Sequence, residues 1–398
     1  MNTILKIRNP WIINPFFYYG LMWILALIGY ELSPSEYCLD LDYGLVIFLT
    51  FSLVVAFFGG AIFNTKLKNK VILIRYEPYS NLLVYVVVVL FILEFVVSGG
   101  IPLYSYLFKT GGITYMQFGI PTLHVIIVTF AIYCLVKYSF QYLIFKQKKD
   151  LILPLLSFLY FLLIYSRGIM LFSLISIVMF FFIDKNITIK QVFFMSSVFV
   201  IISWLFGILG NMRVGSHWSD TSYIFYLAGV NHDASSWFSP MYWVLEYLTC
   251  SLRTLNFNVL EIPPAYRLMD MSYYFIPDFI AKRIFADNVL RPVLQLDWCT
   301  TYTMYGASFT TYGYFGMLLK FLTYVVMAIG IYCIKFKNYV YNIIGLCLLS
   351  TLYVFTVFND MLMYSGYSFS VFYVLLFGKF STKKVSFKCK VKRFHAIS

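Results

Sequence analysis

Charged residues are scarce in this chain. Asp, Glu, Lys and Arg make up 12% of the 398 residues, and hydrophobic residues make up 61%. An average soluble domain carries about 25% charged residues. Acidic residues are the scarcer kind, with 17 Asp and Glu against 30 Lys and Arg. This composition excludes a soluble fold of this length, because too few polar side chains are present to cover its surface.

Residues that bind metals are also few. The chain has four histidines and seven cysteines, and it contains no CxxC, HExxH or HxH motif, so we expect no metal site and no cofactor. Cys38, Cys250 and Cys299 lie in segments expected outside the membrane. A disulfide among them stays open at this stage.

Long hydrophobic runs fill most of the sequence. They recur with lengths of about 17–24 residues, enough to cross a hydrocarbon core of ~30 Å. Backbone groups in lipid must bond within their own segment, and these runs lack the alternation of barrel strands. We therefore expect an all-α polytopic integral membrane protein with about ten transmembrane helices, over residues 13–30, 44–63, 81–98, 122–141, 151–165, 168–183, 191–209, 314–334, 339–358 and 367–380.

The basic residues indicate how these spans are oriented. Twenty of the 30 Lys and Arg residues fall in alternate short loops and at the termini, which the positive-inside rule assigns to the cytoplasm. The net charge of +13 is thereby explained without a nucleic-acid partner. We expect seven spans in 1–210, one large outer loop in 211–313, three spans in 314–380 and a basic cytoplasmic tail in 381–398, with both termini inside.

The loop 211–313 contains most of the candidate chemistry. His217 or Asp220 is our first choice for a general base, because a histidine near a carboxylate can take a proton from a hydroxyl. His232, Asp233 and Glu246 are substitutes. For the two histidines, a purely structural role is the alternative.

The stretch Met241–Leu260 has the pattern of an amphipathic helix at the membrane interface. Glu246, Cys250 and Arg253 follow each other at i, i+4 and i+7, so they share one face of that helix. Two interpretations stay open for Glu246: an internal pair with Arg253, or a carboxylate that faces a substrate.

Two arginines stand out beside the spans. Arg167 lies in the bend Ser166-Arg167-Gly168 between two spans, and Arg213 lies just beyond the next one. A guanidinium fork suits phosphate oxygens, so both are candidates for binding an anionic ligand such as a lipid diphosphate, as are Arg253 and Arg291 in the loop. Snorkelling to the interface, or pairing with nearby acids, is the alternative. Glu94, inside a span, is expected to pair with an arginine of another span or to mark a site.

This layout resembles the Wzy-type O-antigen polymerases, which polymerise oligosaccharide repeat units. The resemblance rests on the number of spans, the late outer loop, the Ser166-Arg167-Gly168 hairpin and Arg213. The stretch from Thr310 to Gly316, with Gly313 and Gly316, is similar to the family's aromatic-rich Gly-x-x-Gly re-entry into the membrane. Many members have an aspartate before the first glycine, where this chain has Tyr312.

The resemblance implies a metal-independent membrane glycosyltransferase of the GT-C type. Such enzymes take a growing glycan from undecaprenyl diphosphate and pass it to an incoming lipid-linked repeat unit, at the outer face of the bacterial cytoplasmic membrane. The product is O-antigen or capsular polysaccharide. Arg167 and Arg213 would hold the donor diphosphate, with Arg253, Arg291 and His232 as further substrate contacts. A chain-length regulator and a flippase are the implied partners.

Two rival functions remain. A flippase for lipid-linked oligosaccharides, or another transporter, would be expected to show internal repeats and broken helices in mid-membrane, and the sequence has no convincing repeat. An O-antigen ligase would share the layout but use a different acceptor.

Overall fold

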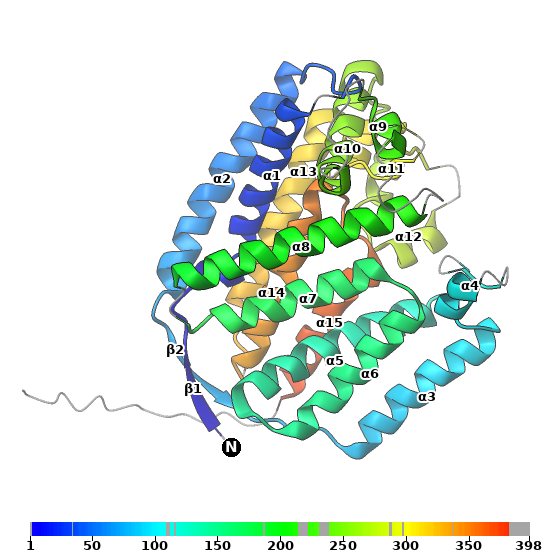
Figure 1. Ribbon diagram of the computed structural model, residues 1–398. Helices are drawn as coiled ribbons and strands as arrows, with labels where there is room; N and C mark the ends of the chain where they lie inside the picture. Colours follow the sequence, from blue (N-terminus) through cyan, green and yellow to red (C-terminus); the bar gives the residue numbers. More distant parts are fainter. Residues whose placement is uncertain are drawn as a thin grey trace, which may run out of the picture.

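The computed structural model describes residues 2–33, 35–108, 112–114, 117–185, 188–213, 222–230, 239–285, 289–296, 298–336 and 338–381. Most of these residues are helical (Figure 1). The helices before the large loop are α1 Pro15–Leu32, α2 Tyr43–Leu67, α3 Asn81–Ser98, α4 Pro102–Phe108, α5 Leu123–Phe145, α6 Ile152–Leu163, α7 Arg167–Phe182 and α8 Ile189–Arg213. Those that follow are α9 Ser222–Ala228, α10 Ser239–Glu261, α11 Leu268–Tyr273, α12 Asp278–Ile284, α13 Gly306–Cys333, α14 Val340–Val354 and α15 Ser365–Phe380.

The expected helical membrane architecture is confirmed at the level of class. Six helical segments among the described residues are long and apolar enough to cross a membrane: α1, α2, α3, α5, α13, and α14 with the short turn that extends it to Val357. The other four expected spans also fall on helices, namely α6, α7, α8 and α15. Because α6, α7 and α15 have only 12, 16 and 16 residues, the total of ten spans stays a prediction.

A two-stranded ribbon is an element that the sequence analysis did not anticipate. Strand β1 (Asn2–Lys6) pairs antiparallel with β2 (Val71–Arg75). Ile72 and Ile74 of β2 are buried while their neighbours are exposed, which is the period of two that a strand requires. Each strand has five residues and lies beside a run of charge, so the pattern is too short to separate from an ordinary loop.

The connections expected inside the cell meet at one end of the molecule. Besides the ribbon, the carboxylate of Glu77 accepts hydrogen bonds from Asn338 Nδ2 at 2.9 Å, Tyr341 Oη at 2.5 Å and Ser381 Oγ at 2.6 Å. Lys137 Nζ lies 3.6 Å from the same group. We call this the basic end, because it exposes Lys6, Arg8, Lys66, Lys68, Lys70, Arg75, Lys146, Lys148, Lys149, Lys185, Lys335 and Lys379.

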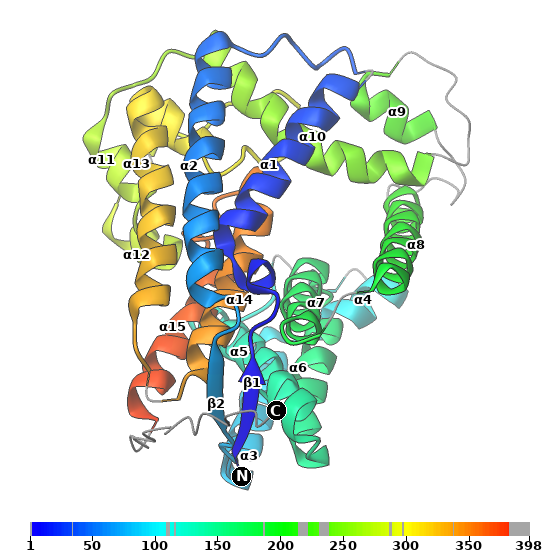
Figure 2. The same cartoon turned by 90° about the vertical axis from the view of Figure 1, so that its left-hand side faces the viewer.

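Helices α9 to α12 gather away from the basic end. Figure 2 shows α10 running across α1 rather than alongside it, and the expected position of this helix at the membrane interface stays a prediction. The start of α10 is fixed to the end of α8, because Trp243 Nε1 donates to Asn211 Oδ1 at 2.6 Å and the indole ring lies against Gly210.

Helix α13 begins inside the expected loop and is kinked where the span was expected to start. Tyr312 and Gly313 have non-helical backbone angles, with φ +63° and ψ −152° at Gly313. The kink frees two carbonyl groups, and the loop satisfies them: Ala265 N donates to Thr310 O at 3.0 Å and Arg267 N donates to Thr311 O at 3.2 Å. The preceding turn, Gly306–Thr311, is buried, so it belongs to the packed interior rather than to a solvated loop.

Candidate functional site

The bend between α6 and α7 places Arg167 at a helix N-terminus. Tyr165 has a left-handed backbone with φ +58°, which reverses the chain within the residues Ile164 to Ser166. Helix α7 begins at Arg167, and the side chain of Ser166 makes no capping hydrogen bond. The first backbone N–H groups of α7 therefore have no partner within the helix.

Aromatic rings hold this bend in place. Tyr165 stacks on Tyr106 of α4, with ring centroids 4.4 Å apart, and the guanidinium of Arg167 lies 5.7 Å from the centroid of the Tyr165 ring. Gly168 lies so close to Tyr367 of α15 that an added Cβ would be 2.6 Å from the tyrosine hydroxyl oxygen. Gly168 thus permits α7 and α15 to approach each other at the level of Arg167.

Arg167 has the electrostatic setting of an anion site. Its side chain is half-buried, and no carboxylate of the described residues lies within 4 Å of it. A helix N-terminus carries about half a positive charge, and its free N–H groups point outward. A guanidinium beside such an end can bind an anion with two kinds of donor, so the bend matches the chemistry expected for a phosphate group.

More cations lie on α12, which contacts the start of α15. Ser365 N donates to Asp278 Oδ1 at 2.9 Å, and Lys282 Nζ lies 3.0 Å from Asp278 Oδ2. Arg283 donates to Thr122 Oγ1 at the start of α5. These contacts link the beginnings of α5, α12 and α15.

Arg213, the second expected anion ligand, is the last residue of α8. Its side chain lies outside the described part of the structure. Figure 1 shows α7 beginning and α8 ending on the same side of the molecule, whereas Figure 2 shows the two helix axes apart. The convergence of Arg167 and Arg213 on one diphosphate stays a prediction.

Glu246 and Arg253 lie in the interior instead. Their side chains form an ion pair with no exposed surface, and Arg253 Nη1 donates to Ser35 Oγ at 2.8 Å. Burial raises the pKa of Glu246, and the neighbouring guanidinium opposes that rise. Of the two interpretations open for Glu246, the observed geometry is the internal pair, and a substrate hydroxyl would have no open path to this carboxylate.

The remaining sequence candidates divide into two groups. His217, Asp220, His232 and Asp233 lie outside the described residues, so the choice of general base stays a prediction. Arg291 is exposed in the segment before α13. Burial raises the pKa of Tyr302 to about 12, and the positive charge of Arg291 opposes this rise.

Among the described residues, the partners of Glu94 are a histidine and a tyrosine of other helices, not the expected arginine. Glu94 is fully buried, His124 Nδ1 of α5 lies 2.7 Å from its Oε1, and Tyr160 of α6 donates to its Oε2. His124 was not among the candidate residues predicted from the sequence. Its position at the very start of a span, with the acid near the outer end of the preceding one, was the available signal.

A second buried ion pair was also missed. Lys320 of α13 lies 2.6 Å from Asp360 Oδ2, and Tyr324 Oη donates to Asp360 Oδ1 at 2.8 Å. A lysine inside an apolar run is costly in free energy unless it is paired. The position of Lys320 between Leu319 and Phe321 could therefore have predicted a buried acidic partner. The pair ties α13 to the connection between α14 and α15.

Comparison with known proteins gives no assignment: no protein-family model, curated protein or solved structure matches this chain.

Proposed function

We propose that this protein is a membrane glycosyltransferase that polymerises oligosaccharide repeat units carried on undecaprenyl diphosphate. In this proposal the growing glycan passes from its lipid carrier onto a new lipid-linked unit, at the outer face of the bacterial cytoplasmic membrane, with both termini of the protein in the cytoplasm. The polymer would be O-antigen or capsular polysaccharide.

The observation that carries the proposal is the environment of Arg167. A half-buried guanidinium stands at the first residue of α7, beside N–H groups that the helix leaves free, and no described carboxylate neutralises it. A soluble anion would not require this position between apolar helices. A diphosphate attached to a lipid does, because its tail stays among the helices while its charge reaches their ends.

The same donors explain how the reaction would be helped. When the bond between the sugar and the diphosphate breaks, negative charge grows on the leaving phosphate. Preorganised donors that face this charge stabilise the transition state more than the ground state. Arg167 would supply that stabilisation together with Arg213. A base in the loop, His217 or Asp220, would take the proton of the acceptor hydroxyl.

The test is genetic complementation with matched arginines. The gene is deleted in its host, and the surface glycan is resolved on a gel after complementation with wild type, Arg167→Ala, Arg213→Ala or Arg267→Ala. Arg267 is the control, because its side chain is 66% exposed and lies 3.9 Å from Asp270. Expression of each variant is checked by immunoblot of the membrane fraction.

We expect single-repeat glycan in the deletion strain and with the Arg167 and Arg213 variants, and long chains with wild type and Arg267→Ala. Long chains with Arg167→Ala at a normal expression level would overturn the role of this site. Loss of even the single-repeat glycan from the deletion strain would favour a flippase or a ligase instead.

A further inference from the structure

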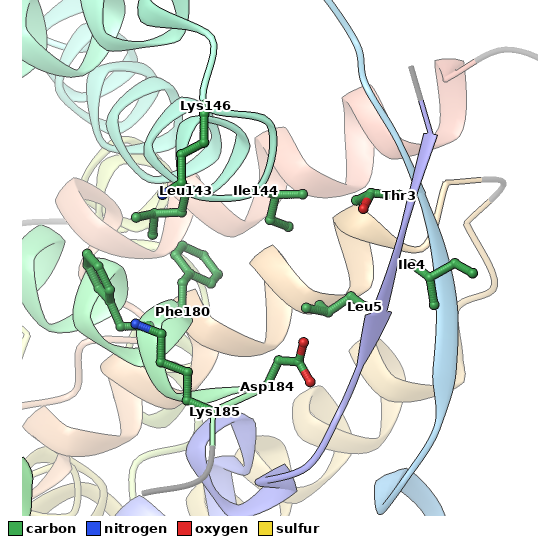
Figure 3. A pocket seen from close by; sticks show the side chains of 10 residues that line it. Thr3, Ile4, Leu5, Leu143, Ile144, Lys146, Phe180, Asp184 and Lys185 are labelled. Atoms are coloured by element: carbon green, nitrogen blue, oxygen red, sulfur yellow. The ribbon is translucent and has the colours of Figure 1, made fainter.

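A pocket of about 300 Å³ opens at the basic end (Figure 3). It lies between strand β1 and the C-terminal ends of α5 and α7. Its volume is at the low end of the range of about 300–1,000 Å³ that is usual for small-molecule sites. The pocket lies at the opposite end of α7 from Arg167, and nothing in the inference below rests on the proposed function.

The pocket walls divide into an apolar part and a cationic part. Leu5, Leu143, Ile144 and Phe180 form the apolar surface, and Figure 3 shows Lys146 and Lys185 entering from opposite edges. Both lysines are exposed. Within the part of the chain that the structure describes, neither forms an ion pair with a carboxylate.

The one acid of the pocket is already engaged. Asp184 Oδ1 lies 3.3 Å from Arg8 Nε, so its charge is offset from outside the pocket. The two lysines therefore leave an uncompensated positive field above an apolar floor. The backbone at Lys185 is fixed, because Asn9 Nδ2 donates to Phe182 O at 2.6 Å and to Lys185 O at 2.7 Å.

This combination selects the ligand. An anion alone would leave the apolar floor uncovered. A hydrocarbon chain alone would leave Lys146 and Lys185, which lie 5.5 and 5.4 Å from the ring centroids of Tyr142 and Phe181, without an anionic partner. Ile4 and Phe181 at the pocket keep 68% and 40% of their surface exposed, so the apolar surface continues from the pocket to the outside of the protein. Basic pockets between membrane helices bind anionic lipid head groups for these reasons.

We propose that the pocket binds an anionic phospholipid from the leaflet at the basic end. Lys146 and Lys185 would contact the phosphate, and the apolar floor would receive the first carbons of an acyl chain. The bound lipid would join β1 to the ends of α5 and α7. Lysines at helix C-termini also favour the helix dipole, and this simpler role predicts no dependence on lipid.

The experiment uses the full chain in nanodiscs of phosphatidylcholine with increasing phosphatidylglycerol. The readout is the thermal unfolding midpoint, since a ligand that binds only the folded state raises it. The double variant Lys146→Gln/Lys185→Gln is compared with Lys66→Gln/Lys68→Gln, which removes the same charge from exposed residues of the basic end that do not line the pocket. Leu143→Trp fills the pocket and keeps both lysines.

We expect phosphatidylglycerol to raise the midpoint of the wild type and of the Lys66/Lys68 variant alike. In the Lys146/Lys185 variant the phosphatidylglycerol fraction that gives half the effect should increase about twenty-five-fold, from roughly a factor of five per lysine. In Leu143→Trp the effect should be lost, while its midpoint in pure phosphatidylcholine shows that it folds.

Three outcomes would overturn the proposal. Equal weakening in both lysine variants would mean that the whole basic end attracts anionic lipid without a site. Stabilisation of the wild type by glycerol 3-phosphate in pure phosphatidylcholine nanodiscs would mean that the ligand is a soluble anion. An absence of any response to phosphatidylglycerol would leave the lysines with the helix-dipole role.

Discussion

Among single residues, Glu246 and Arg253 show how a shared helix face can indicate either chemistry or structure. The two side chains are one ion pair without exposed surface. A buried pair gains little over an apolar pair of the same shape, but breaking it leaves an uncompensated charge in the interior. The sequence spacing correctly predicted that the two residues share one face of a helix. Their burial could not be predicted, because it depends on the contact with Ser35 and on the packing of α10.

We predict that Glu246→Gln and Arg253→Met each destabilise the protein by about 3–5 kcal/mol. The double variant Glu246→Leu/Arg253→Met should be much less destabilised than the sum of the two. Thermal unfolding in one detergent measures all four proteins. Strictly additive losses would contradict a coupled pair, and an active double variant would remove Glu246 from the possible bases.

A second residue-scale effect concerns Cys250 and Cys299, which are free thiols. Burial raises the pKa of Cys250, and the hydrogen bond that its thiol donates lowers the pKa of Cys299 from 9.0 to about 7. Because the folded-state pKa of Cys299 is depressed, its stabilising contribution is fully present above pH 9 and is lost as the pH falls through 7.

Under reducing conditions, we therefore expect the wild type to gain stability between pH 7 and pH 9 relative to Cys299→Ser. The gain is at most roughly 2–3 kcal/mol, the free energy that corresponds to this fall in pKa. Cys250→Ala should remove the same gain, and Cys333→Ser, at an exposed position on α13, should keep it. Parallel pH profiles for wild type and Cys299→Ser would refute the assignment.

At the scale of one element, α13 shows what the Gly-x-x-Gly stretch does. Gly313 has backbone angles that only glycine adopts readily, and a Cβ on Gly316 would lie 2.1 Å from the carbonyl oxygen of Ser308. The sequence analysis singled out both glycines by resemblance. Their physical reason required the backbone, because the kink depends on the loop residues Ala265 and Arg267, which bond the freed carbonyls.

We predict that Gly313→Ala costs about 1–3 kcal/mol, from the strained backbone region, and that Gly316→Ala costs at least as much. Gly330→Ala is the matched control on the same helix, since no atom lies within 4 Å of its added Cβ. It should be neutral or stabilise by up to about 1 kcal/mol. Similar midpoints for all three variants would show that the kink imposes no glycine requirement.

On the scale of the whole molecule, much of the organisation could be predicted because it follows from simple counts. The lengths of the hydrophobic runs predicted the helices. The positions of the Lys and Arg residues predicted which loops lie together at one end of the molecule. What could not be predicted depends on contacts between distant segments. Three such contacts are the pairs of Lys320 with Asp360, of Glu94 with His124, and of strand β1 with β2. In each pair, the sequence shows one unusual residue or segment but does not show which distant partner it contacts.

The gathering of basic loops at one end predicts sidedness. In a Cys38→Ser/Cys333→Ser/Cys389→Ser background, a membrane-impermeant maleimide should label Asp40→Cys in intact spheroplasts. It should label Lys148→Cys only after lysis, because the positive-inside rule places the basic end in the cytoplasm. Both positions are exposed, so access to the reagent is limited only by the membrane. The reverse order of labelling would invert the topology and place Arg167 in the cytoplasm.

The hydrogen bonds of Glu77 have a consequence for biosynthesis. Two of its partners, Asn338 and Ser381, follow it by 261 and 304 residues, so a ribosome has made helices α3 to α13 before either can bind. Until then, the carboxylate of Glu77 lacks these two hydrogen bonds. Closure of the basic end is therefore a late event, and it follows the synthesis of the last helix. A nascent chain released before Ser381 would keep its early helices but lack the hydrogen bond that Ser381 donates to Glu77.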